Sequence, residues 1–199
     1  MDITRARFAG SAASVEQTPK LKLPEFAFVG RSNVGKSSLI NMLCNNATLA
    51  KTSSRPGKTL LINHFLINDA WYIVDLPGYG YANRSKTERA NIRSIIDQYV
   101  SRSQMLEMLF VLLDSRLPLQ KIDLEFINGL GEKGIPFSIV FTKGDKLGIN
   151  ALTSMVERNK KELLEYWEDL PPVFTTSSQT KMGREAIIDY IYEILKLVK

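Results

Sequence analysis

A glycine-containing loop near the start of the chain limits what the chain can fold into. Residues Gly30 to Ser37 read GRSNVGKS and match the pattern G-x-x-x-x-G-K-[ST]. The loop follows an apolar run at 26–29 and precedes apolar residues at helical spacing, which predicts a strand, a loop and a helix in that order. In such a loop the backbone N–H groups and the helix N-terminus surround phosphates. Lys36 is then expected to reach the β- and γ-phosphates, and the Ser37 hydroxyl to bind Mg²⁺.

The rest of the chain alternates between strand-like and helix-like segments. Strands are expected at 26–29, 60–67, 71–74, 109–113, 137–141 and 173–175. Asn68-Asp69 predicts a tight turn between the second and third of them, and helical periodicity fills most of the later intervals. The pattern predicts an α/β fold of the P-loop NTPase type, with a six-stranded mostly parallel sheet, one antiparallel edge strand and helices on both faces.

Length and composition favour one globular domain. The chain has 199 residues, of which 44% are hydrophobic and 24% charged. Residues 1–22 show no clear periodicity and are expected to form a flexible arm, with one domain over 23–199. The single Cys44, the absence of a secretory signal and apolar runs too short for a membrane span favour a cytoplasmic protein without membrane insertion. Arg5, Arg7 and nearby Ser and Ala leave a transit peptide as the alternative.

Two later motifs bear on which nucleotide is bound. Asp75-Leu76-Pro77-Gly78 ends a predicted strand, where the carboxylate can hold Mg²⁺ through water and the glycine N–H can meet the γ-phosphate. Thr142-Lys143-Gly144-Asp145 follows another strand. Its carboxylate can accept hydrogen bonds from N1–H and the exocyclic amine of guanine, whereas adenine has an acceptor at N1. The lysine stem is expected to lie over the purine.

The motifs GRSNVGKSS, RPGKT, DLPGYGYA and TKGD together resemble the EngB/YsxC/YihA family of ribosome-biogenesis GTP-binding proteins, from about Leu23 to the C-terminus. The resemblance implies a Ras-like G domain that binds GTP and GDP with Mg²⁺ and acts as a monomeric GTPase in assembly of the large ribosomal subunit. It also implies a link to cell division and septation. Thr59 corresponds to the switch I threonine, so Ser37 and Thr59 are the implied metal ligands.

The resemblance and the motifs give one set of nucleotide-binding residues. The set comprises Gly30, Arg31, Ser32, Asn33, Val34, Gly35, Lys36, Ser37, Gly57, Lys58, Thr59, Asp75, Leu76, Pro77, Gly78, Thr142, Lys143, Gly144, Asp145, Thr176, Ser177 and Ser178. The last three resemble the short loop whose backbone N–H groups contact the guanine carbonyl. Thr142 stands where many other GTPases have Asn, and Gln179 where a lysine is often found.

The residue after Gly78 bears on catalysis. Many GTPases place a water-orienting glutamine there, but this chain has Tyr79, so intrinsic hydrolysis is expected to be slow. GTPases with an asparagine at the position of Asn33 often use it to hold K⁺, which supplies positive charge at the reaction. Lys36, Thr59 and Asn33 are therefore the expected catalytic residues, with a catalytic element from the partner as the alternative.

Basic residues concentrate around two segments that are expected to respond to GTP, which we call the switch segments: the one that contains Thr59 and the one that follows Asp75. The basic residues are Lys51, Arg55, Lys58, Arg84, Lys86, Arg89 and Arg93. Such a surface fits a polyanion, which the resemblance implies is ribosomal RNA, with Tyr79 and Tyr81 stacking on exposed bases; the alternative is a solvated face with both tyrosines packed inward. Two other functions stay open at this point: an RNA-binding module with negligible GTP turnover, and a P-loop ATPase.

Overall fold

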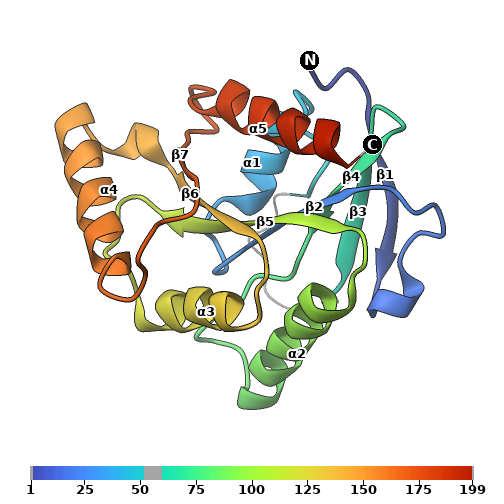
Figure 1. Cartoon of the computed structure of the whole chain (residues 1–199), viewed down its shortest axis with the longest axis horizontal. Helices are drawn as coiled ribbons and strands as arrows, with labels where there is room; N and C mark the ends of the chain where they lie inside the picture. The colour runs from blue at the N-terminus through green and yellow to red at the C-terminus, as the bar shows by residue number, and fades with distance from the viewer. Residues whose placement is uncertain (1, 52–59, 199) are drawn as a thin grey trace.

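The computed structural model describes residues 2–51 and 60–198, which form one sheet with helices on both faces (Figure 1). The strands are β1 (Ala6–Ala12), β2 (Glu25–Gly30), β3 (Ile62–Ile67), β4 (Trp71–Asp75), β5 (Leu106–Asp114), β6 (Phe137–Thr142) and β7 (Val173–Thr175). The α-helices are α1 (Lys36–Leu43), α2 (Lys86–Arg102), α3 (Lys121–Glu132), α4 (Ile149–Leu163) and α5 (Arg184–Leu197), with short 3₁₀ turns at Val15–Gln17 and Gly144–Lys146.

The sheet order is β1-β3-β4-β2-β5-β6-β7. From β4 to β7 each neighbouring pair is parallel, whereas β3 runs antiparallel to both β1 and β4. The predicted hairpin is confirmed, and its turn residues Asn68 and Asp69 have φ angles of 50° and 54°, which suit a two-residue hairpin turn. Because the parallel strands share one direction, the loops after β2, β4, β5, β6 and β7 meet at one edge of the sheet.

The N-terminal segment corrects two expectations. The sheet has seven strands rather than six, because β1 pairs with β3 inside the stretch that we expected to be a flexible arm. The antiparallel β3 consequently lies one place inside the edge. The Asn68 side-chain oxygen accepts from the backbone N–H groups of Thr4 and Arg5, at 2.9 Å each, which ties the segment to the hairpin turn. β1 is mostly exposed, and its register shifts between Phe8 and Gly10, so it gives little of the apolar alternation by which strands are recognised.

Two hydrophobic layers hold the sheet. Phe26 and Phe28 of β2 face α1 and α5, whereas Ala27 and Val29 face α2, α3 and the end of α4. Burial on both faces explains why the parallel strands read as continuous apolar runs. Within the described residues, no helix has both the length and the apolar character that crossing a membrane requires.

Candidate nucleotide-binding site

The predicted phosphate loop joins β2 to α1. Gly35 is the residue before the helix and has a φ of 99°, and Asn33 has a φ of 65°, so the loop uses left-handed backbone at two positions. Glycine adopts this conformation without a steric penalty. Val34 is buried between them and anchors the loop, while Lys36 and Ser37 form the first turn of α1. The N-terminus of the helix therefore faces the loop, as a phosphate site requires.

Lys36 and Asp75 connect the phosphate loop to the end of β4. The Lys36 ammonium forms an ion pair with the Asp75 carboxylate, and their side chains are 14% and 12% exposed. β4 lies next to β2 with Phe28 and Asp75 in register, which places the carboxylate beside the loop. The Asp75 carboxylate and the Ser37 hydroxyl are oxygen donors of the kind that Mg²⁺ prefers, so these residues fit a magnesium ion.

The segment after Asp75 is attached to the phosphate loop through its backbone. The Ser32 N–H donates to the Tyr79 carbonyl at 2.9 Å, and the Tyr79 N–H donates to the Gly30 carbonyl at 3.1 Å. A Cβ at Gly78 would lie 3.2 Å from the Ser32 nitrogen and Cα, so a side chain there would press on the loop. Leu76 and Pro77 are buried and fix the start of this segment.

Tyr79 does not stack on exposed bases, which corrects one expectation. Its side chain is 3% exposed, and its hydroxyl donates to the buried Asp123 carboxylate at 2.9 Å. Burial raises the pKa of Asp123, although the hydrogen bond from Tyr79 and the charge of Arg31 oppose that shift. Tyr81 remains half-buried, with the Arg84 guanidinium 6.0 Å from its ring centre.

The predicted base-recognition loop follows β6. The Thr142 hydroxyl donates to the Val34 carbonyl at 2.7 Å, so the residue that replaces the usual asparagine still ties this loop to the phosphate loop. Lys143 adopts left-handed backbone with a φ of 60°. The Gly144 N–H donates to the Thr176 carbonyl at 2.9 Å, and a Cβ at Gly144 would lie 3.1 Å from that oxygen. Glycine therefore permits the close approach of the loop after β7.

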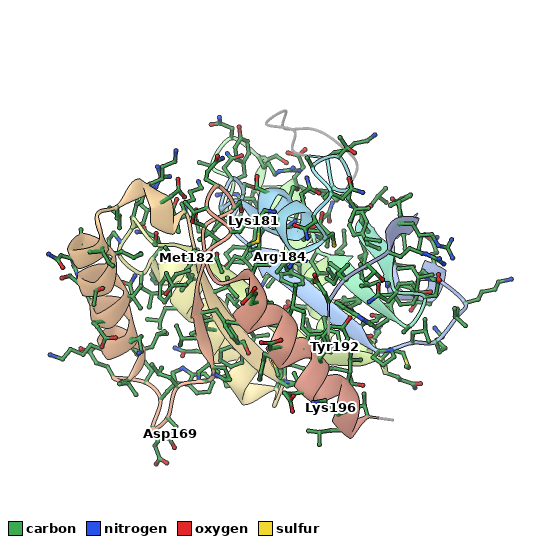
Figure 2. The ribbon with its side chains drawn as sticks, turned by 90° about the horizontal axis from the view of Figure 1, so that it is seen from above. Asp169, Lys181, Met182, Arg184, Tyr192 and Lys196 are labelled. Carbon is green, nitrogen blue, oxygen red and sulfur yellow. The ribbon has the colours of Figure 1, made fainter. Side chains whose placement is uncertain are left out.

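The loop after β7 fixes the orientation of Asp145. The Ser177 hydroxyl donates to the Asp145 carboxylate at 2.8 Å, and the Ser177 N–H donates to the Met182 carbonyl at 3.1 Å. Ser178 follows, half-buried. The hydrogen bond between Ser177 and Asp145 was not predicted; a serine two residues after a strand was its only sequence signal. Figure 2 shows Met182 on the segment that leads from this loop into α5.

The structure brings most of the predicted site together at one edge of the sheet. The residues at 30–37, 75–78, 142–145 and 176–178 all lie at the ends of parallel strands or directly beyond them. Gly57, Lys58 and Thr59 lie outside the described residues. The contacts join four loops: Thr142 reaches the phosphate loop, Lys36 reaches Asp75 and Ser177 reaches Asp145. Such an arrangement can hold phosphates, a divalent cation and a purine in one line.

The fold and this set of loops define the class of P-loop GTP-binding proteins with a G domain. The family described as 50S ribosome-binding GTPase matches residues 25–143. A solved structure of Era from Aquifex aeolicus, bound to GDP and AlF₄⁻, superposes with a TM-score of 0.67 over 87% of this chain and 57% of Era, at 20% identity. At this identity, the likeness shows a shared fold and nothing more.

Full-length relatives define the family more narrowly. The probable GTP-binding protein EngB of Porphyromonas gingivalis is 57% identical over 98% of this chain and 96% of its own length. The corresponding protein of Phocaeicola vulgatus is 56% identical over all of both chains. A crystal structure of a probable EngB covers 86% of this chain and 98% of its own, with a TM-score of 0.65. The chain belongs to the EngB family of GTP-binding proteins.

Proposed function

We propose that the chain is a Mg²⁺-dependent GTPase switch whose GTP form docks on the large ribosomal subunit or its precursor, and whose hydrolysis of GTP releases it. The observation that carries the proposal is the convergence of the phosphate loop, Asp75 and Asp145 at one edge of the sheet. Family membership supports the ribosomal partner, because the matching family is described as ribosome-binding. The same membership supports action as a cytoplasmic monomer in ribosome assembly, with normal cell division and septation depending on it.

The main site residues have distinct roles in this proposal. Backbone N–H groups of 30–37 bind the phosphates, and Lys36 contacts the β- and γ-phosphates. Ser37 and Thr59 ligate Mg²⁺, with Asp75 acting through water. Asp145 pairs with the guanine edge, Lys143 lies over the purine, and backbone N–H groups of 176–178 meet the guanine carbonyl. When bound, the metal neutralises charge on the β- and γ-phosphates.

Slow intrinsic hydrolysis is the second part of the proposal. The buried position of Tyr79 supports it, because a side chain bonded to Asp123 does not orient an attacking water. A K⁺ ion held by Asn33 would then supply positive charge at the reaction. Asn33 is exposed, and its backbone carbonyl, not its side-chain amide, accepts a hydrogen bond from the Lys143 ammonium, at 2.8 Å. Turnover measured in K⁺ and in Na⁺, for the native chain and Asn33→Ala, tests this step. Equal rates in all four reactions contradict it.

The basic surface next to the switch segments is the proposed site for ribosomal RNA. Arg84, Lys86, Arg89 and Arg93 lie before and along the first half of α2, directly after the segment that holds Tyr79. Lys86 and Arg89 are exposed, whereas the Arg93 guanidinium lies 3.6 Å from the Asp97 carboxylate. Ordering of the switch segments by GTP would change what this surface presents to the phosphate backbone of RNA.

Competition binding separates the proposal from its two alternatives. GTP and GDP should displace a labelled guanine nucleotide and ATP should not, because ATP cannot pair with Asp145. Preferential displacement by ATP would establish the ATPase alternative. Added large ribosomal subunits should then accelerate GTP hydrolysis. Negligible turnover with and without subunits would establish the RNA-binding module instead.

A further inference from the structure

Asp114 lies between the phosphate loop and the base-recognition loop. It is the last residue of β5, and β5 separates β2 from β6 in the sheet. Gly30 at the end of β2 pairs with Leu112, and Thr142 at the end of β6 pairs with Asp114 itself. The two loops follow strands that are not neighbours. A side chain at the end of β5 can therefore connect them.

The Asp114 carboxylate has a fixed direction. Its Oδ1 accepts from the Arg116 backbone N–H and Nε, both at 3.0 Å, and its Oδ2 accepts from Arg116 Nη2 at 2.8 Å. The Asp114 side chain is only 10% exposed. Burial raises its pKa, but hydrogen bonds from Arg116 and then the charge of Lys143 outweigh burial, so the pKa lies below its ordinary value. The carboxylate is therefore charged at neutral pH.

Lys143 is the second partner of this carboxylate. Its ammonium lies 3.3 Å from Asp114 Oδ2 and donates to the Asn33 carbonyl at 2.8 Å. Its stem crosses the phosphate loop, because a Cβ at Gly35 would lie 3.6 Å from Lys143 Cε. The ammonium is thus held between Asp114 and the backbone of Asn33, and the end of the methylene stem lies beside Gly35. A stem in that position can pack against a flat base, whereas a freely rotating one must first be ordered.

We propose that Asp114, oriented by Arg116, is a positioning residue for nucleotide binding: it holds the Lys143 ammonium so that the lysine stem is in place for the guanine base before the nucleotide arrives. The inference rests on the proposed role of Lys143 at the base. It assigns a function in nucleotide affinity to a residue outside the phosphate, magnesium and base motifs. Because Lys143 meets the base and the phosphate loop, the effect of Asp114 on GDP and on GTP is the same.

A double-mutant cycle on Asp114→Asn and Lys143→Met tests the inference, with the affinities for GDP and GTP as the readout. Each single variant should bind both nucleotides about tenfold more weakly than the native chain, and the double variant should bind them no more weakly than either single variant. Asp97→Asn is the matched control. Asp97 also lies beside an arginine and a lysine, Arg93 at 3.6 Å and Lys133 at 3.5 Å, but on α2 away from these loops. It should leave both affinities unchanged.

The possible failures point to different errors. If Lys143→Met weakens both nucleotides but Asp114→Asn changes neither, Lys143 retains its proposed role and the role of Asp114 is wrong. If Asp114→Asn still weakens binding in the Lys143→Met background, Asp114 acts by another route and the inference is also wrong. If Lys143→Met has no effect, the ammonium is not needed to place the stem and the inference is wrong, whereas the contact between stem and base, which methionine can still make, is not refuted. Thermal unfolding of the nucleotide-free variants checks that each remains folded.

Discussion

Replacing Asp145 by Asn should change which purine the protein binds. In the native chain the Ser177 hydroxyl donates one hydrogen bond to Asp145 Oδ1, and the Asp145 side chain is 16% exposed. The remaining lone pairs of the carboxylate are therefore available to a ligand. Guanine presents two donors, N1–H and the exocyclic amine. Asparagine accepts from only one of them and turns its own amine toward the other, so one hydrogen bond is lost and two donors face each other.

The size of the effect follows from this change. A hydrogen bond to a charged group contributes about 1.5–3 kcal/mol. The variant loses one such bond, leaves its guanine donor opposed by another donor, and weakens the second bond to that of a neutral amide, so the total cost is about 3–6 kcal/mol. That is roughly a hundredfold to ten-thousandfold in GTP affinity. Xanthosine triphosphate carries a carbonyl in place of the amine, which an asparagine amine can meet. Its affinity should therefore rise in the variant while that of GTP falls.

Competition against a fluorescent guanine nucleotide measures both changes. Asp169→Asn, an exposed carboxylate in the turn before β7 that Figure 2 labels, should alter neither affinity. GTP affinity within twofold of the native value would refute the assignment of Asp145 to the guanine edge. A loss of GTP binding without a gain for xanthosine triphosphate would show that the variant damages the loop instead of reversing the pairing.

Three further variants test how the structure supports the site. Arg184 donates to the Met42 and Leu43 carbonyls at the end of α1, with Nη2 2.8 Å from Leu43, so Arg184→Met should cost about 2 kcal/mol and lower the unfolding midpoint by about 5 °C. Gly183 has a φ of 78°, and an added Cβ would lie 2.3 Å from the Thr175 carbonyl, so Gly183→Ala should lower both the unfolding midpoint and the GTP affinity. Gly129→Ala is the control: it lies inside α3, where no atom obstructs the Cβ, and should change neither. Because burial raises the pKa of Asp123, ionisation of this carboxyl in the folded protein costs stability as the pH rises above its ordinary pKa of 3.8. Asp123→Asn should therefore have a higher unfolding midpoint than the native chain at about pH 8, and the difference should disappear toward about pH 4. Calorimetry measures all three, and an Asp123→Asn effect independent of pH would contradict the last.

Each part of the site that could be predicted from the sequence is one continuous stretch of the chain. The phosphate loop, Asp75 and the loop at 142–145 each combine a short motif with a strand directly before it, so local pattern and position agree. The hairpin was predictable for the same reason, because Asn68-Asp69 separates two apolar runs. In each case the residues that carry the signal are neighbours in the chain.

The parts that could not be predicted depend on packing between distant segments. Tyr79 and Asp123 meet because the segment after Asp75 is hydrogen-bonded to the phosphate loop and lies against α3. Asp114 gains its place only from the strand order β2-β5-β6, which no local motif records. β1 joins the sheet by pairing with β3, and Asn68 holds the residues just before it, although the residues of β1 are mostly exposed. Burial and partners decided these three outcomes, and periodicity carried no information on them.

Co-sedimentation with large ribosomal subunits in each nucleotide state tests the central proposal most directly. The chain loaded with a non-hydrolysable GTP analogue should sediment with the subunits, and the GDP-loaded chain should stay in the supernatant. Combined Lys86→Glu and Arg89→Glu should weaken sedimentation, whereas Arg158→Glu with Lys161→Glu on the exposed face of α4 should not. Equal sedimentation of the GTP and GDP forms, or none in either state, would contradict the account.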